Sequence, residues 1–293
     1  MGLRRTIIAV SLLLMPSIVP AQQPVSVPFD PDWVKPFPPF RVIGNIYWVA
    51  TWDLASYLIT TPEGHILINS GLAGTVPQIV QGIEALGFRI GDVKFLLATH
   101  AHFDHVAGLA ELKNRTSAKI ALSRADAELF QSGGTSDFLF GNSPRAHYMS
   151  APVDRIIEEG ERIALGGTTL TAHLHPGHTK GATSFTATVR EDGKTWRVGI
   201  VNMGSINDGV SVTGMPGFPD IEAAYRKTFR DQKALDIDVW LASHAAQFNL
   251  HRKYQPGNSY DPERFVDSAG YRAAVARMEA SLLAALEKER ARK

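Results

Sequence analysis

The feature that most constrains this chain is a short stretch of metal-binding side chains that directly follows an apolar run. Residues 99–105 read Thr-His-Ala-His-Phe-Asp-His, which places three imidazoles and one carboxylate within six residues. The preceding run, 93–98, is apolar and bounded by polar residues, as is typical of a short buried strand. Open α/β sheets place their ligands in loops at the carboxyl ends of strands. The sequence therefore predicts a metal site at a strand end.

The residue types and their spacing indicate which side chains share an ion. Neutral imidazole and carboxylate oxygen both suit Zn²⁺. His100 and His102 stand two positions apart, so in an extended segment both point the same way and can hold one metal. Asp104 and His105 lie past the bend, before an amphipathic helix expected at 106–112, and can turn toward a second ion. The alternative is a solvated, histidine-rich turn.

Two further histidines follow short strands and are expected to complete two sets of ligands. His178 comes after the break at Pro176-Gly177, and His244 comes just after an apolar strand expected at 237–241. Three protein ligands with one open position are typical of a catalytic zinc, whereas four close a structural site. The predicted sets are His100, His102 and His178 for one ion, and Asp104, His105 and His244 for the other.

The remaining histidines have no comparable setting. His173 and His175 share one face of a strand expected at 168–175 and are interpreted as strand-face residues, with a ligand role as the alternative. His65, His147 and His251 are assigned to the surface or the core.

Composition limits the partners that suit the chain. The chain has no cysteine, so every metal ligand must be another residue type. For the same reason the fold must be stabilised by burial of a hydrophobic core and not by disulfides. A formal net charge of +1 without a basic stripe gives no electrostatic reason to bind nucleic acid.

The first 21 residues have the pattern of a secretory signal peptide. Arg4 and Arg5 precede a mostly apolar stretch, 6–19, and Val19-Pro20-Ala21 forms a small-residue cleavage signal. We expect cleavage to leave residues 22–293 as a single exported domain in the periplasm, off the membrane. An uncleaved anchor is the alternative.

Apolar runs and turn signals predict two groups of strands with helices beside them. Strands are expected at 42–50, 55–60, 65–69, 93–98, 119–123, 156–165, 168–175, 183–189, 195–201 and 237–241. Helices are expected at 75–87, 124–132 and 221–235, and a helical region opens at 261. The stretch 133–153 is predicted to be a long irregular loop. The fold expected is an α/β sandwich of four layers, αβ/βα.

Aromatic residues in the first part of the chain are candidates for a pocket wall. The proline-rich segment 23–41 cannot form a regular helix or central strand and is expected to lie extended over the surface. Its Trp33 or Phe37 is a candidate wall of a binding pocket. Trp52 is expected at the tip between two strands, where an exposed aromatic ring can meet a ligand.

Together these residues resemble the metallo-β-lactamase superfamily, whose signature is His-x-His-x-Asp-His followed by later histidines. The resemblance covers nearly the whole chain after the leader, with matching ligand positions in 99–108, 176–181 and 242–244. Within the superfamily the chain is most similar to the third subclass of class B β-lactamases. Three segments carry this finer match: 134–141, 153–161 and Ser243-His244.

The segment Val201-Asn202-Met203 separates the branches of this superfamily. Its thioesterases, lactonases and many nucleases have an aspartate here that bridges the metals, and the first two β-lactamase subclasses have a cysteine. The resemblance implies that only the third subclass manages without either, because its second zinc uses the histidine matching His105. Asp208 is the alternative bridging acid if the alignment shifts.

The same resemblance suggests which residues meet the substrate. Ser205 falls where the family often holds a substrate carboxylate, and Met203 takes a place where this subclass usually has serine. Asn69 stands where the superfamily commonly has an aspartate that orients a ligand. Ser205, Met203, Trp52 and Trp33 are the expected substrate contacts.

The resemblance implies zinc-dependent hydrolysis of the β-lactam amide of penicillins, cephalosporins and carbapenems, giving antibiotic resistance. A hydroxide shared by two Zn²⁺ ions is expected to attack the carbonyl, while the second zinc stabilises the departing nitrogen. Asp104 and His105, which would hold that zinc with His244, are therefore the expected catalytic residues.

The expected partner is a small-molecule β-lactam. The chain is expected to be a monomer, because no heptad or broad apolar stripe favours a dimer. The alternatives are a periplasmic di-zinc lactonase or thioester hydrolase, and a metal-binding protein without enzymatic activity.

Overall fold

The computed structural model describes residues 26–292, so the expected leader lies outside the described residues. In this part of the chain seven strands form one sheet, in the order β1 to β7, and five form a second, in the order β12-β11-β10-β9-β8. The first sheet contains β1 (Phe40–Ile43), β2 (Ile46–Trp48), β3 (Tyr57–Thr61), β4 (Gly64–Ile68), β5 (Val93–Leu97), β6 (Lys119–Ser123) and β7 (Arg155–Ile157). The second contains β8 (Arg162–Leu165), β9 (Thr168–Leu174), β10 (Thr183–Glu191), β11 (Lys194–Val201) and β12 (Val239–Ala242).

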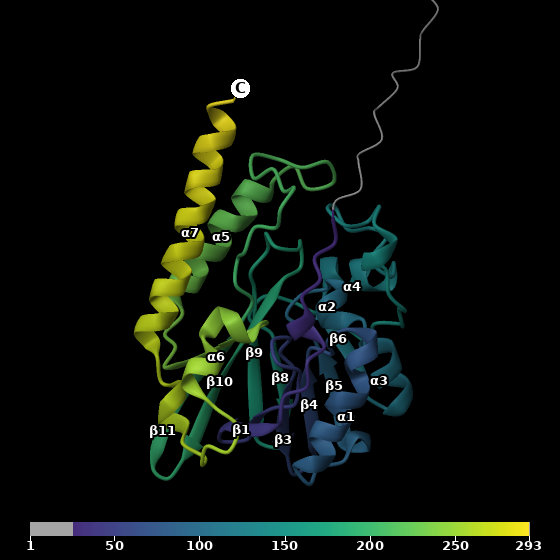
Figure 1. The fold of residues 1–293 in the computed structure, drawn as a ribbon, viewed down its shortest axis with the longest axis vertical. Helices are drawn as coiled ribbons and strands as arrows, with labels where there is room; N and C mark the ends of the chain where they lie inside the picture. The colour runs from purple at the N-terminus through teal and green to yellow at the C-terminus, as the bar shows by residue number, and fades with distance from the viewer. Residues whose placement is uncertain (1–25, 293) are drawn as a thin grey trace, which may run out of the picture.

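Helices cover the outer faces of both sheets, which confirms the predicted four-layer αβ/βα sandwich (Figure 1). Helices α1 (Val76–Ala85), α3 (Leu109–Arg115) and α4 (Arg124–Gln131) lie on the side of the first sheet. Helices α5 (Ile221–Ala234) and α7 (Ser268–Arg290) lie on the side of the second. Two short helices, α2 (Phe103–Val106) and α6 (Leu250–Lys253), complete the α-helical elements of residues 26–292.

Successive side chains along a strand point to opposite faces of its sheet, and in β4 both faces are buried. In β4, Ile66 and Ile68 join the core between the sheets, whereas Leu67 packs with the α1 residues Ile79 and Ile83 in a separate outer core. All five side chains are at most 1% exposed. A strand with period two that is buried on both faces belongs in the middle of a layered fold.

The single strand predicted over 42–50 is wrong, because the chain turns within it. Strands β1 and β2 pair antiparallel around Gly44 and Asn45. Gly44 has φ 53°, and a Cβ there would lie 2.3 Å from Cγ1 of Val189 in the opposite sheet. Glycine at this position permits both the turn and the close contact between the sheets.

The strand predicted over 156–165 is also wrong, since its two halves belong to different sheets. β7 pairs with β6, and β8 pairs with β9. The chain turns between them at Gly160, which has φ 74°, and the backbone N–H of Glu158 donates to the Glu161 carboxylate at 2.8 Å. This turn carries the chain from one half of the sandwich to the other.

The helix predicted at 106–112 begins earlier and is interrupted. Its first part, α2, starts at Phe103, and α3 starts at Leu109. At the break, the Gly108 N–H donates to Ser70 Oγ at 3.1 Å, and a Cβ on Gly108 would lie 2.7 Å from the Ser70 carbonyl oxygen. As a result Asp104 and His105 lie on a helical turn rather than on the loop before a helix.

No helix among residues 26–292 is long and apolar enough to span a membrane.

Candidate metal centre

The six predicted ligands converge at one edge of the sandwich. Each side chain follows the end of a strand or lies on the short helix α2; four of them are buried, and His178 and His244 are half-buried. The positions are His100 and His102 after β5, Asp104 and His105 in α2, His178 after β9, and His244 after β12.

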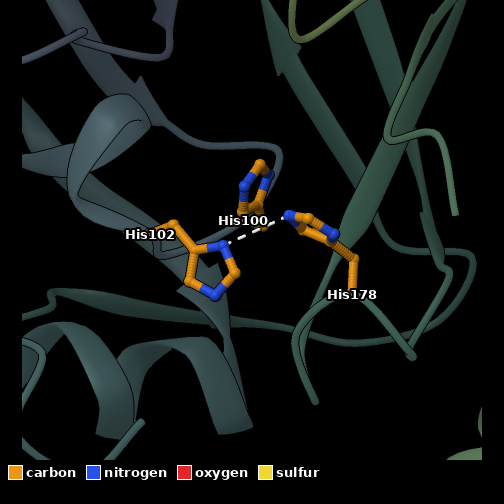
Figure 2. A group of neighbouring side chains, drawn as sticks. All are labelled: His100, His102 and His178. Carbon is orange, nitrogen blue, oxygen red and sulfur yellow. Dashed lines mark hydrogen bonds between the residues drawn. The ribbon is translucent and has the colours of Figure 1, made fainter. Parts of the chain in front are cut away.

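The first predicted set is assembled from both halves of the molecule. His102 Nδ1 lies 3.2 Å from His178 Nε2, and the ring of His100 stands 4.6 Å from that of His178 (Figure 2). Figure 2 shows the three rings arranged around a common space, with His178 reaching in from the second half. Imidazole nitrogens that converge in this way suit a single metal ion.

The second predicted set has the same character and adds a carboxylate. His105 Nε2 lies 3.2 Å from His244 Nε2. The Asp104 carboxylate oxygen Oδ2 is 3.1 Å from the first nitrogen and 3.5 Å from the second. His100 connects the two sets, because its ring centroid is 4.3 Å from that of His105. The six side chains therefore form two adjoining ligand groups.

The surroundings fix the protonation of several ligands. Burial, reinforced by neighbouring imidazoles, lowers the pKa of His178 to about 3 and that of His100 well below its usual 6.5. Both rings are thus neutral, the form that binds metals. Burial raises the pKa of Asp104, but contacts with His105 and His244 lower it more, so the pKa of this carboxyl lies well below its usual 3.8. Asp104 is therefore ionised.

Three contacts orient the ligand rings from outside. Asp53 Oδ2 lies 2.8 Å from His244 Nδ1, and Asp137 Oδ2 lies 3.3 Å from His102 Nε2. The carbonyl oxygen of Ser205 lies 2.9 Å from His178 Nδ1. Such partners turn the other ring nitrogen toward the metal and raise its basicity. Neither Asp53 nor Asp137 was among the predicted site residues, although Asp137 lies in the 134–141 segment that carried the resemblance.

We expect Asp53→Asn to weaken zinc binding to the second group by roughly 10- to 100-fold, because an amide no longer holds His244 as a carboxylate does. A zinc titration monitored with a competing chelator measures this change. Asp32→Asn is a matched control, because the Asp32 side chain is 46% exposed and pairs with Lys35 rather than with a ligand ring. Equal zinc affinity in the wild type and Asp53→Asn would contradict the assigned role.

Asp126 in α4 links the two loops that supply the first group. Its carboxylate accepts hydrogen bonds from Ala101 N at 2.9 Å, Thr179 Oγ1 at 3.1 Å and Gly181 N at 3.1 Å. Burial raises the pKa of Asp126 to about 6, against the lowering effect of these hydrogen bonds. Because Ala101 lies between His100 and His102, and Thr179 follows His178, this side chain sets the spacing of the ligands.

The ligands open into a cavity of about 210 Å³. Trp33, Phe103 and Phe140 contribute aromatic lining. Amides and hydroxyls contribute polar lining, from Asn202, Ser205, Asn207, Ser243 and Gln247. No lysine or arginine is among the described residues that line the cavity. A small cavity of this kind suits a compact ligand with one apolar side.

Three of the four predicted substrate contacts line the cavity, and the fourth does not. Trp33, Met203 and Ser205 line the cavity, and the Ser205 hydroxyl lies 3.2 Å from His178 Nδ1. Trp52 does not line it, so the expected contact between Trp52 and substrate is not supported. Its ring instead stacks on His251 with centroids 3.9 Å apart, beneath the Lys35 ammonium group. Asp208 is exposed and does not line the cavity either.

The loop between β11 and α5, which carries Met203 and Ser205, is held by the C-terminal helix. The Glu289 carboxylate accepts hydrogen bonds from Ser211 Oγ, Val212 N and Thr213 Oγ1, each at 2.8 Å, and from Thr213 N at 3.0 Å. Burial raises the pKa of Glu289, but these bonds lower it to about 2. Its contribution to stability is therefore present above the unfolded pKa of 4.5 and is lost as the pH falls toward 2.

We expect Glu289→Ala to increase amide hydrogen exchange across residues 207–218 by about tenfold, because four buried or half-buried donors lose their acceptor. Mass spectrometry of exchange measures this effect. Glu287→Ala is the matched control, since Glu287 is an exposed carboxylate on the same helix. Identical exchange in the two variants would contradict the role of Glu289.

The donor set fits zinc. Five imidazoles and one ionised carboxylate are borderline ligands of the type zinc prefers, and the ligand atoms of His100, His102 and His178, and those of His100, Asp104 and His105, each lie within 4.8 Å of one another. The fold and the site thus define a metal-binding hydrolase with its centre at the edge where the two sheets meet.

Comparison with known proteins agrees with this class. Residues 53–191 match the family model of the metallo-β-lactamase superfamily. A β-lactamase from Chitinophaga pinensis is 40% identical, with a TM-score of 0.86 over 89% of this chain and 98% of that one. A class B3 di-zinc metallo-β-lactamase from an Alaskan soil metagenome is 38% identical, with a TM-score of 0.86 over 90% and 99%. The metallo-β-lactamase GOB-18 from Elizabethkingia meningoseptica is 39% identical, with a TM-score of 0.87 over 92% and 99%.

The chain belongs to the metallo-β-lactamase superfamily, and class B3 enzymes are among its structural neighbours. The curated relatives match this chain over only part of their own length. A probable metallo-hydrolase of Burkholderia pseudomallei is 32% identical over 38% of this chain and 36% of that protein. A hydroxyacylglutathione hydrolase of Cereibacter sphaeroides is 32% identical over 38% and 35%, and an N-acyl homoserine lactonase of Azorhizobium caulinodans is 27% identical over 47% and 60%.

Proposed function

We propose that this protein is a di-zinc β-lactamase that hydrolyses the cyclic amide of penicillins, cephalosporins and carbapenems. The observation that carries the proposal is the absence of an acidic residue from the cavity wall after β11. Asn202 and Met203 line the cavity there, and the nearby Asp208 is exposed. Among the described residues, the second ligand group thus depends on His105 beside Asp104 and His244, the arrangement expected of the third β-lactamase subclass.

In this proposal His100, His102 and His178 hold the first zinc, and Asp104, His105 and His244 hold the second. When bound, zinc ions lower the pKa of water toward neutrality and polarise a carbonyl group. The chain's own groups position the substrate beside them. Trp33, Phe103 and Phe140 pack against its apolar part and exclude water from that side of the cavity.

The substrate's polar groups meet neutral side chains of the cavity. With no lysine or arginine among its described lining residues, we assign the substrate carboxylate to hydroxyl and amide donors such as Ser205 and Asn207. Because the Ser205 carbonyl oxygen also lies next to His178, this residue connects substrate binding to the first ligand group.

The proposal extends to where the enzyme acts. The leader pattern of residues 1–21 supports export and cleavage, so that a monomeric enzyme of residues 22–293 works in the periplasm on a small-molecule substrate. Hydrolysis there would destroy antibiotics before they reach their targets and would give resistance.

The test is a hydrolysis panel with the purified, zinc-loaded protein. A penicillin, a cephalosporin and a carbapenem are compared with an N-acyl homoserine lactone and a glutathione thioester, the substrate types suggested by the partly matching relatives. The proposal predicts turnover of at least one β-lactam at a kcat/KM above that for either ester. Turnover of the lactone or thioester alone would replace it with the corresponding hydrolase.

A further inference from the structure

Helix α5 presents a row of polar side chains to the interior of the molecule. Tyr225, Thr228 and Gln232 stand at intervals of three and four residues, which places them on one face of the helix, and all three are at most 1% exposed. Gln232 Nε2 donates to the carbonyl oxygen of Asn202 at 2.7 Å and so holds the segment that follows β11. Buried polar groups are costly unless each has a partner, so the partners of the other two indicate what the row does.

Tyr225 shares its acceptor with a predicted metal ligand. Its hydroxyl donates to the Ser205 carbonyl oxygen at 2.9 Å, and the same oxygen lies 2.9 Å from His178 Nδ1. Burial raises the pKa of Tyr225, so this hydroxyl remains a donor. A carbonyl oxygen has two lone pairs and cannot donate, so it accepts both bonds, and Nδ1 of the neutral His178 ring carries the proton.

This arrangement leaves the other ring nitrogen of His178 free to bind a metal. Nε2 is unprotonated in the same tautomer, and it lies 3.2 Å from His102 Nδ1. Figure 2 shows it directed toward the space that the three rings enclose.

The same face of α5 also fixes the loop before His178. A Cβ on Gly177 would lie 2.6 Å from Cδ1 of the Tyr225 ring, so glycine is needed for the ring to approach this closely. About one turn along the helix, Thr228 Oγ1 donates to the Pro176 carbonyl oxygen at 2.6 Å. Helix α5 thus holds the carbonyl group that orients the ligand's ring and the backbone of the two residues before the ligand.

We propose that Tyr225 and Thr228 are positioning residues that preset His178 for metal binding. Tyr225 holds the carbonyl group that determines which ring nitrogen is protonated, and Thr228 holds the loop from which the ring projects. A preset ligand binds a metal ion more tightly, because less of the site must be ordered when the ion binds. The proposal concerns the first ligand group and applies whichever bond the protein hydrolyses.

The test compares Tyr225→Phe and Thr228→Val, each of which removes a hydroxyl and keeps the shape of the side chain. In a zinc titration with a competing chelator, we expect each variant to weaken the binding of one zinc ion by about tenfold. Tyr271→Phe is the matched control, because Tyr271 is also 1% exposed and its hydroxyl donates to a backbone carbonyl oxygen, that of Gln232, at 2.8 Å. It loses a bond of the same kind and should bind zinc as the wild type does.

Exchange of the His178 Nδ1 proton gives a measurement that needs neither zinc nor turnover. In the metal-free protein, nuclear magnetic resonance should show this proton exchanging with water at least about tenfold faster in Tyr225→Phe than in the wild type or Tyr271→Phe. A general loss of stability would affect the two tyrosine variants alike, so a difference between them reports the position of the His178 ring.

Neither measurement uses a β-lactam, so loss of the β-lactamase assignment leaves the test intact. Zinc affinity of Tyr225→Phe or Thr228→Val within about threefold of that of Tyr271→Phe would overturn the proposal. Equal exchange of the His178 Nδ1 proton in Tyr225→Phe and Tyr271→Phe would also overturn it, and this result alone decides if the wild type binds no zinc.

Discussion

Replacing Asp104 with alanine is expected to lower kcat/KM for β-lactam hydrolysis by roughly 10³-fold while leaving the fold intact. Asp104 is the carboxylate of the two ligand groups, and its side-chain contacts are with His105 and His244. Without it, the second ligand group loses its one carboxylate, and little else in the molecule loses a partner. Steady-state kinetics, zinc content per chain and circular dichroism together measure the three parts of this expectation.

Asp208→Ala is the matched control, because Asp208 is an acid close in sequence to the cavity wall but exposed. It is expected to behave as the wild type. If Asp208→Ala lost as much hydrolysis as Asp104→Ala, or if Asp104→Ala kept full activity, the second ligand group as assigned here would be incorrect.

Asp126→Ala is expected to lower the free energy of unfolding by about 2–4 kcal/mol and to weaken zinc binding to the first group at least about tenfold. The substitution leaves two backbone N–H groups and the Thr179 hydroxyl buried without their acceptor. It also removes the link between the loop of His100 and the loop of His178. Denaturant unfolding of the metal-free protein and a zinc titration measure the two effects separately.

Glu128→Ala offers the comparison on the same helix, since Glu128 is exposed and Asp126 is 2% exposed. Wild-type stability and zinc affinity are expected for it. An Asp126→Ala protein as stable as Glu128→Ala, with the same zinc affinity, would show that the carboxylate does not hold the two loops.

The ligand positions were predictable from the sequence because each depends on local features. His100 and His244 each follow a short apolar strand, and His178 follows the break at Pro176-Gly177 that ends an alternating strand. Strand ends in a layered α/β fold lie at shared edges, so residues from distant segments were expected to meet, and the structure brings them within a few ångströms of one another.

The parts that were missed depend on contacts between distant segments. Gly44 gave no signal that the strand at 42–50 would turn, because the reason lies in its approach to Val189 of the other sheet. Asp53 and Asp126 are single acids in ordinary surroundings in the sequence, and only the fold shows the groups that they bond. Trp52 was expected at the cavity, but stacking on His251 places its ring elsewhere.

The most direct test of the account is a zinc titration of the metal-free protein, monitored by hydrolysis of a chromogenic cephalosporin. The account predicts no hydrolysis without metal, activity that rises with added zinc and is complete at about two ions per chain, and loss of activity with a strong chelator. Hydrolysis that survives complete removal of zinc, or a protein that binds two zinc ions and hydrolyses no β-lactam, would contradict it.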